Sequence, residues 1–222
     1  MTTNSPFDLL YRDDALLIVN KPAGLLAVPG RGADKQDCLS ARLLADFPDS
    51  LVVHRLDMAT SGVMVFARGM AMQRRLSQMF REREVSKRYI AVVSGRLEQE
   101  AGEITLPLIC DWPNRPKQMV DHTQGKPSLT RYRLLGMEGV NSRVELEPVT
   151  GRTHQLRLHM AAIGHPILGD ALYGDGTSAS RLLLHAGSLS FKHPVSGEPL
   201  NFLSSSPFQL PNVNVGRFSP RL

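Results

Sequence analysis

The chain has 222 residues, of which 42% are hydrophobic and 21% are charged, enough to bury a full core in one domain or two small ones. Its net charge of +5 favours an anionic partner. No segment has the roughly 18 to 20 consecutive apolar residues of a membrane-spanning helix, and residues 1–6 lack the basic and apolar runs of a signal peptide. The two cysteines, Cys38 and Cys110, belong to no C-x-x-C pair, so a disulfide framework and a zinc knuckle have no support, and we expect a cytoplasmic protein.

Strand-like and helix-like segments alternate along the chain without a regular β-α-β order. Apolar strands are expected at residues 16–20, 51–56, 62–67, 89–94, 129–135 and 142–147. One helix is expected over residues 70–84, where Met72, Leu76, Met79 and Phe80 recur at helical spacing, and another over 150–163, with Thr150 as its candidate N-cap. This mixture favours an α+β domain.

The two ends of the chain differ from the middle in composition. Residues 1–6 have the character of a loose lead-in, and residues 206–222 are rich in Ser, Pro and Asn without periodicity. We therefore expect one folded domain over residues 7–205 between two flexible tails.

Several common catalytic designs find no support in the sequence. There is no G-x-G-x-x-G or G-x-x-x-x-G-K-[ST] loop for phosphate groups and no G-x-S-x-G elbow for acyl transfer. His154 and His159 lie five residues apart, which places them about 140° apart around a helix, and no H-E-x-x-H motif occurs. We expect no metal site and no cofactor.

The positive charge is concentrated in one stretch. Residues 68–88 hold seven Lys or Arg residues against two Glu residues, so the rest of the chain is nearly neutral. The stretch fits either a solvated helix face or a surface that binds the phosphates of a nucleic acid.

The segment H-R-L-D-M-A-T-S, residues 54–61, places polar side chains between two apolar runs. Asp57 could be an ordinary turn residue. However, Arg55 and Asp57 share strand parity beside apolar neighbours, an arrangement that costs free energy unless it has a function. Arg157 borders the apolar stripe of the expected helix 150–163, and a half-buried arginine requires a carboxylate or phosphate partner.

Six blocks together resemble the RluA family of pseudouridine synthases. They are N-K-P-A-G-L (20–25), H-R-L-D-M-A-T-S-G (54–62), K-R-Y-I-A (87–91), G-R-T-H-Q-L-R (151–157), G-H-P-I-L-G-D (164–170) and L-L-L-H-A (182–186). The resemblance covers about residues 7–203, and the segments 80–84 and 106–118 are most similar to members of dual specificity. It implies a single catalytic domain with a mixed, largely antiparallel central sheet flanked by helices and loops. We expect no S4-type RNA-binding domain ahead of these blocks, because only about 50 residues precede H-R-L-D.

The resemblance implies an isomerase that converts uridine into pseudouridine. The glycosidic C–N bond breaks, the base turns, and C5 of the base joins C1′ of the ribose. Asp57 would be the catalytic carboxylate, attacking C1′ or removing a proton from C2′, and Arg157 would keep it ionised. Tyr89 would stack on the uracil, although its sequence context also fits a core residue. Arg55 would fill the space that the flipped uridine leaves.

The remaining site residues follow from the same resemblance. Leu183 or Leu184 would line the uracil pocket, and parity does not decide between them. Arg74, Arg75, Arg81 and Arg83 would contact the RNA backbone. Trp112 fits either a loop that faces RNA or a loop pinned to the core, and His54 and His185 are expected to be structural.

Stem-loops of tRNA and 23S rRNA are the expected partners, with uridine 32 of the anticodon loop and uridine 746 of the rRNA as targets of a monomeric enzyme. Two alternatives stay open: the same chemistry at other rRNA sites, and a non-catalytic RNA-binding or assembly factor. An intact set of Asp57, Tyr89 and Arg157 argues against the second.

Overall fold

The computed structural model describes residues 7–208, whose strands form one ten-stranded sheet and one separate two-stranded hairpin. Along the sheet the order is β1-β2-β4-β11-β5-β10-β9-β6, with β12 paired to β11 and β3 paired to β4. The strands are β1 (Asp8–Arg12), β2 (Leu16–Lys21), β3 (Ser50–Val52), β4 (Ser61–Arg68), β5 (Ser86–Val93), β6 (Ala101–Thr105), β7 (Leu108–Cys110), β8 (Gln118–Val120), β9 (Leu129–Glu138), β10 (Asn141–Pro148), β11 (Leu184–Lys192) and β12 (Pro199–Leu203). The helices are α1 (Leu39–Asp46), α2 (Gly69–Glu82) and α3 (Gln155–Ala162), and a 3₁₀ helix covers Ala33–Lys35.

The large sheet is mixed and largely antiparallel, which confirms the predicted α+β class. Strands β4 and β11 run parallel, with His185 opposite Ser61 and Ala186 opposite Gly62. All other pairings between the described strands are antiparallel. The parallel pair joins strands β1, β2, β3 and β4, called the N-terminal half below, to the other strands of the large sheet, called the C-terminal half.

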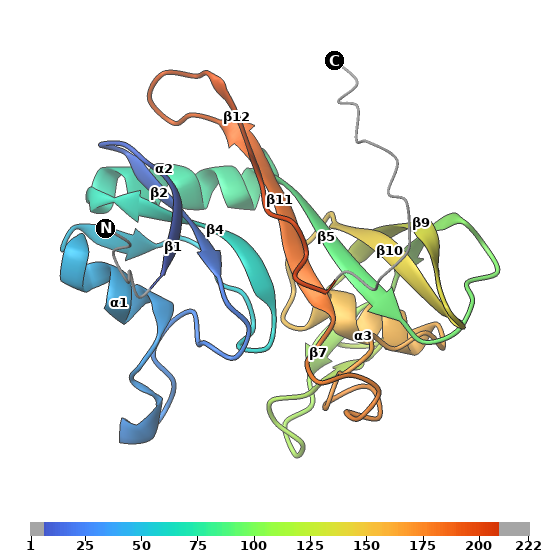
Figure 1. Cartoon of the computed structure of the whole chain (residues 1–222). Helices are drawn as coiled ribbons and strands as arrows, with labels where there is room; N and C mark the ends of the chain where they lie inside the picture. The colour runs from blue at the N-terminus through green and yellow to red at the C-terminus, as the bar shows by residue number, and fades with distance from the viewer. Residues whose placement is uncertain (1–6, 209–222) are drawn as a thin grey trace.

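Two groups of elements lie on either side of β11 (Figure 1). The N-terminal group combines β1, β2, β3 and β4 with α1 and α2. Because side chains alternate along β2, Leu17 and Val19 belong to one core cluster with residues of α1, whereas Leu16 and Ile18 belong to another with residues of α2. The two helices therefore cover opposite faces of this half, and β2 is buried on both.

The second group combines β5, β6, β9 and β10 with α3. Leu156 and Met160 of α3 are buried with Val144 and Leu146 of β10 in a third cluster, as predicted for the apolar stripe of this helix. Ile163, the third residue of that predicted stripe, follows the end of α3 and is 36% exposed. The hairpin of β7 and β8 projects beyond the sheet at the bottom of the view in Figure 1. None of the described helices is long and apolar enough to cross a membrane.

Each expected element exists, but the predicted end of β3 and the predicted start of α3 were wrong, and both errors affect the site. Strand β3 ends at Val52, and residues 54–57 are a loop, so the argument from strand parity for Arg55 and Asp57 does not apply. Helix α3 begins at Gln155 instead of Thr150. The Thr150 hydroxyl accepts a hydrogen bond from the Leu129 N–H and donates one to the Gln155 side chain, and so it does not cap the helix.

The predicted tails lie mostly outside the described residues. This holds for residues 1–6 and for 209–222 of the expected tail 206–222. The three described residues of that segment, 206–208, contact the folded domain. Arg143 donates hydrogen bonds to the Ser206 hydroxyl at 3.2 Å and to the Phe208 carbonyl at 2.6 Å.

The parallel contact between β4 and β11 requires a glycine at position 62. Gly62 has φ of +120°, and a Cβ atom there would overlap the backbone N and O atoms of Ala186. The two halves of the sheet therefore approach each other more closely than any residue with a side chain would permit.

We predict that Gly62→Ala lowers the free energy of unfolding by roughly 3 kcal/mol or more, because backbone strain adds to steric overlap with β11. Gly139→Ala is the matched control, because Gly139 also has positive φ (+62°) but has no atom within 4 Å of the added Cβ. It should cost only about 1 kcal/mol. Urea unfolding of both variants measures the difference, and equal losses would show that the β4–β11 approach is not the cause.

Candidate active site

A cleft of about 540 Å³ opens where the two halves of the protein meet. Both halves contribute walls to it. The N-terminal half supplies the loop after β3 and the end of α2, and the C-terminal half supplies β5, the segment after β10 and the start of α3. Its polar and aromatic lining residues include His54, Arg55, Asp57, Phe80, Arg81, Arg83, Lys87, Tyr89, Arg152, His154 and Arg157.

Asp57 faces this cleft and is paired with Arg157. The Arg157 guanidinium donates a hydrogen bond from Nη1 to Asp57 Oδ2 at 3.1 Å. The Asp57 side chain is 28% exposed and the Arg157 side chain only 6%. The carboxylate is therefore accessible from the cleft, whereas its cationic partner, although it borders the cleft, is almost fully buried. The Asp57 carbonyl accepts a hydrogen bond from the Thr60 N–H, so the backbone closes the turn and the side chain is left for Arg157.

Arg157 is itself held by a second carboxylate, that of Asp170. Nε and Nη2 of Arg157 donate to the two Asp170 oxygens at 2.8 and 2.7 Å, a bidentate pair in which the Asp170 side chain has no exposure. Asp170 Oδ1 also accepts hydrogen bonds from the N–H groups of Leu172 and Tyr173. Asp170 thus fixes the plane of the guanidinium and leaves Nη1 directed at Asp57.

The ionisation of the buried pair follows from these contacts. Burial by itself raises the pKa of Asp170, but the hydrogen bonds from Arg157 and the two N–H groups outweigh it, so the pKa of Asp170 is lowered. Burial by itself lowers the pKa of Arg157, and the bonds to Asp170 and Asp57 raise it above the usual value. Arg157 is therefore a permanent cation beside Asp57.

Lys21 is hydrogen-bonded to the loop that carries Asp57, on the buried side of that loop. Its side chain is fully buried, and Nζ donates to the carbonyls of Pro22, Leu25 and Met58 at 2.8, 2.7 and 3.1 Å. All three ammonium hydrogens therefore have partners. Burial lowers the pKa of Lys21 to about 8, and the nearby Asp57 opposes this shift. The lysine of the N-K-P-A-G-L block thus ties the turn after β2 to the residue that follows Asp57.

Tyr89 and Leu184 bring apolar surface to the cleft. Tyr89 lies on β5 between Leu146 of β10 and Ala186 of β11 and is partly buried. Burial, and then Asp57, raise the pKa of Tyr89, so its phenol is neutral at physiological pH. Leu184 lines the cleft, whereas Leu183 is not among its lining residues. Of the two leucines, Leu184 is therefore the one that borders this cleft.

The predicted arginines divide into two groups. Arg55, Arg81 and Arg83 are exposed and line the cleft. Arg74 and Arg75 are exposed on α2 but do not line it, and Arg75 lies 4.0 Å from Glu84. Arg83 ends α2 in the left-handed conformation, with φ of +63°.

Trp112 and the two expected structural histidines have distinct surroundings. Trp112 is 66% exposed with the Arg115 guanidinium 4.6 Å from its ring centre, so the reading in which it pins a loop to the core is wrong. His54 accepts a hydrogen bond from the Val65 N–H and stacks on Phe80, and burial lowers its pKa to about 3. His185 contacts the Ser61 hydroxyl at 2.8 Å.

Sequence patterns assigned no separate role to three residues that the fold places around Asp57 and Arg157. Asp170 lies in the G-H-P-I-L-G-D block and His154 in G-R-T-H-Q-L-R, so the blocks contained them but did not reveal their contacts. Tyr173 had no signal of its own. Among residues 7–208 no cluster of three or more His, Cys, Asp or Glu side chains is close enough to hold a metal ion.

We predict that Asp170→Asn lowers the free energy of unfolding by roughly 3 to 5 kcal/mol, because it leaves a buried guanidinium without its main counter-charge. Asp37→Asn is the control. It removes a carboxylate from another arginine pair, with Arg42, in which the Asp37 side chain is 68% exposed, and should have far less effect. Urea unfolding at neutral pH compares the two, and equal small losses would contradict the role of Asp170.

Comparisons with known proteins agree with this arrangement. The RNA pseudouridylate synthase family model matches residues 15–162. The dual-specificity RNA pseudouridine synthase RluA of Yersinia pestis is 52% identical over 204 residues, covering 90% of this chain and 99% of the relative. The protein of the same name from Escherichia coli K12 is 50% identical, covering 90% and 93%.

Solved structures give the same result. The human RNA pseudouridylate synthase domain containing 1 protein aligns with a TM-score of 0.77 at 30% identity, covering 94% of this chain and 87% of that chain. The human domain containing 4 protein aligns with a TM-score of 0.73 at 26% identity, covering 90% and 88%. A cleft with a carboxylate held by a buried arginine, on this sheet and with these relatives, identifies the chain as a member of the RNA pseudouridylate synthase family.

Proposed function

We propose that this enzyme isomerises uridine to pseudouridine in two RNAs, at uridine 32 of the tRNA anticodon loop and uridine 746 of 23S rRNA. The identity of about half of all aligned residues with relatives named as dual-specificity enzymes supports two substrates. The observation that carries the chemistry is the Asp57 carboxylate, which faces the cleft and is hydrogen-bonded to the buried Arg157.

Asp57 acts as the catalytic carboxylate in this proposal. It either attacks C1′ of the ribose or removes a proton from C2′, and both routes require the ionised form. Arg157 favours that form by its permanent positive charge. The C1′–N1 bond breaks, C1′ then bonds to C5, C5 loses its proton and N1 gains one, so that substrate and product are isomers.

The target uridine has to leave its loop to reach Asp57, since C1′ and the base edge are inaccessible in a stacked strand. We assign the space beside Tyr89 and Leu184 to the uracil, because an aromatic face and an aliphatic side chain suit a planar base. The neutral phenol of Tyr89 favours stacking over proton uptake. Arg55 is exposed at the cleft and is assigned to the gap that the uridine leaves.

Arg81 and Arg83 line the cleft, and Arg74 and Arg75 lie further along α2. We assign all four to the RNA backbone, with the first two closest to the flipped nucleotide. The exposed Trp112, under the Arg115 guanidinium, suits contact with an unpaired base. One chain supplies Asp57, Tyr89 and Arg157, which supports a monomer, and the free cysteines suit the reducing cytoplasm.

We expect Asp57→Asn to abolish pseudouridine formation in an anticodon stem-loop and in a 23S rRNA stem-loop, because an amide can neither attack C1′ nor accept the C2′ proton. Its affinity for both RNAs should stay within a few-fold of wild type, which filter binding measures. Turnover by this variant would disprove the assigned role. A wild-type enzyme that binds both RNAs without modifying either would favour a non-catalytic RNA-binding protein.

The double variants Arg81→Ala/Arg83→Ala and Arg74→Ala/Arg75→Ala remove equal charge from α2 and its end. We expect the first to weaken RNA binding roughly tenfold and to reduce the slope of log K against log salt by about 1 to 2, as each phosphate contact contributes nearly one. The second should have a smaller effect on both quantities. A larger effect of the second variant would move the phosphate contacts away from the cleft.

A further inference from the structure

Asp57 has a second neighbour on its Oδ2 atom besides Arg157. His154 Nε2 lies 3.7 Å from that oxygen, and the His154 side chain is 9% exposed. The distance is too long for a hydrogen bond. A small rotation of either side chain would close it, and hydrogen bonds in enzyme sites commonly shorten when substrate binds.

The far side of the imidazole is fixed by Tyr173. His154 Nδ1 lies 2.8 Å from the Tyr173 hydroxyl, and the two rings meet edge to face with centres 5.7 Å apart. The Tyr173 ring also lies under the Arg157 guanidinium, 5.3 Å from its centre. Tyr173 therefore contacts both groups that approach Asp57.

The hydrogen bonds around Tyr173 favour one position of the imidazole proton of His154. The backbone N–H of Gln118 donates to the Tyr173 oxygen at 2.7 Å, so this oxygen is an acceptor there and retains its own hydrogen. Donating that hydrogen to Nδ1 of His154 satisfies every group in the chain. A neutral His154 then carries its proton on Nε2, the atom that faces the negative charge of Asp57.

The backbone at His154 is shaped for this contact. His154 has φ of +53°, a left-handed conformation that costs free energy in a residue other than glycine. It directly precedes α3, and Arg157 lies in the first turn of that helix. The strained residue therefore allows two side chains, three positions apart, to approach the same carboxylate oxygen.

The charge of His154 depends on several groups around it. Burial lowers its pKa first, Arg157 and Arg55 act in the same direction, and Asp57 and Asp170 oppose them. The net result is a lowered pKa, so the ring is neutral at physiological pH. The neutral ring therefore provides a hydrogen-bond donor for Asp57. It adds no second positive charge, which would make the carboxylate less basic and less nucleophilic.

We propose that His154 and Tyr173 form a positioning pair for Asp57, in which Tyr173 fixes the imidazole so that its Nε2–H bonds Oδ2 in the substrate complex and directs Oδ1 at the ribose. Within residues 7–208, Oδ1 makes no hydrogen bond and is left for the reaction. This inference rests on the proposed function of the site. It also links the catalytic carboxylate to the hairpin of β7 and β8, because Gln118 begins β8 and its N–H donates to the Tyr173 oxygen.

The test compares His154→Ala, His154→Gln, Tyr173→Phe and the double variant His154→Ala/Tyr173→Phe on an anticodon stem-loop RNA. Tyr173→Phe keeps the ring over Arg157 and removes only the hydroxyl. We expect it to lower kcat roughly tenfold with KM within about twofold, since misdirecting a catalytic group slows the chemical step more than binding. His154→Ala should lower kcat at least as much, and His154→Gln should regain part of the loss by donating its amide N–H.

The double variant distinguishes a pair from two independent residues. If Tyr173 acts through His154, the double variant loses no more kcat than His154→Ala alone. Losses that multiply, a change in KM alone, or unchanged kcat in Tyr173→Phe would each overturn the inference while wild-type turnover upholds the proposed function. Absence of wild-type turnover would overturn the proposed function itself. Thermal unfolding of each variant separates a folding defect in His154→Ala from a catalytic one, and Tyr173→Phe remains decisive in that case.

Discussion

The buried guanidinium of Arg157 lies between two carboxylates, and the rest of the site depends on how it is shared. Asp170 takes two of its hydrogen bonds in full burial, and Asp57 takes one at the edge of the cleft. A single buried cation between two partners can satisfy a structural carboxylate permanently and still stabilise the charge of a reactive one. Asp170 fixes the orientation of the Arg157 guanidinium and offsets the free energy of its burial. The buried arginine is therefore stable whatever the protonation state of Asp57.

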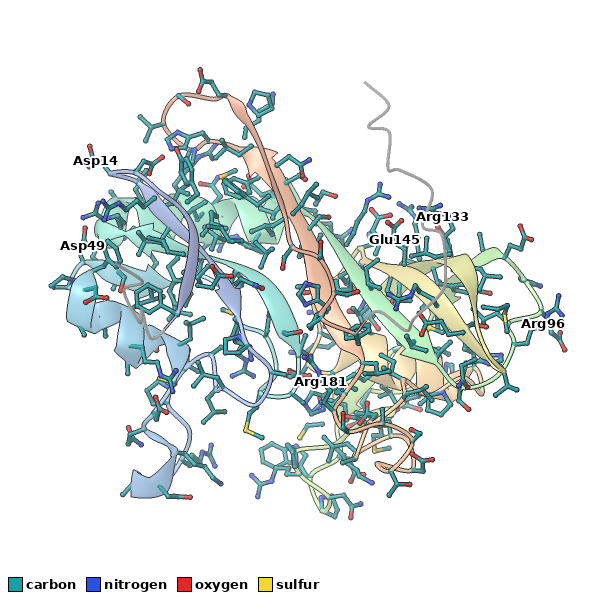
Figure 2. All side chains as sticks on the ribbon, in the orientation of Figure 1. Asp14, Asp49, Arg96, Arg133, Glu145 and Arg181 are labelled. Atoms are coloured by element: carbon teal, nitrogen blue, oxygen red, sulfur yellow. The ribbon has the colours of Figure 1, made fainter. Side chains whose placement is uncertain are left out.

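The sheet supplies the frame in which these residues meet. Asp57 comes from the N-terminal half, whereas Arg157 and Asp170 come from the C-terminal half, and the parallel contact of β4 with β11 joins the two. Arg181, which Figure 2 shows near the lower end of β11, donates a hydrogen bond to the Ser61 hydroxyl at the same junction. Lys21 is hydrogen-bonded to the Asp57 loop through the Met58 carbonyl. The cleft is therefore a product of the junction between the halves and not of either half alone.

Much of the fold could be predicted because apolar periodicity reports burial directly. Strands β2, β4 and β10 and helix α2 were expected within two residues of their observed limits, whereas β5 begins and β9 ends three residues beyond the expected ranges. The segment 51–56 was misassigned because Val53 and Leu56 continue the apolar pattern although the chain has already left the sheet. The start of α3 was also predicted wrongly. Thr150 has the residue type of an N-cap, but its hydroxyl is hydrogen-bonded to Leu129 of β9 and to the Gln155 side chain.

The site residues divide in the same way. Asp57, Arg157 and Tyr89 lie in short blocks whose order resembles a family, and the fold brings all three to one cleft. The partnership of Asp170 with Arg157, and the contacts of Tyr173 with His154 and Gln118, join segments that no local pattern connects. The exposure of Trp112 likewise depends on a hairpin whose projection from the sheet was not predictable from its composition.

The roles of Asp57 and Arg157 are tested most directly by mapping pseudouridine in tRNA and 23S rRNA from cells that lack this gene. The same cells are then supplied with the wild type, Asp57→Asn or Arg157→Met at matched protein levels. We expect both tRNA position 32 and rRNA position 746 to lose pseudouridine in cells without the gene and only the wild type to restore them. Restoration by Arg157→Met would contradict the role of the shared guanidinium. Unchanged pseudouridine in cells without the gene would contradict the proposed function.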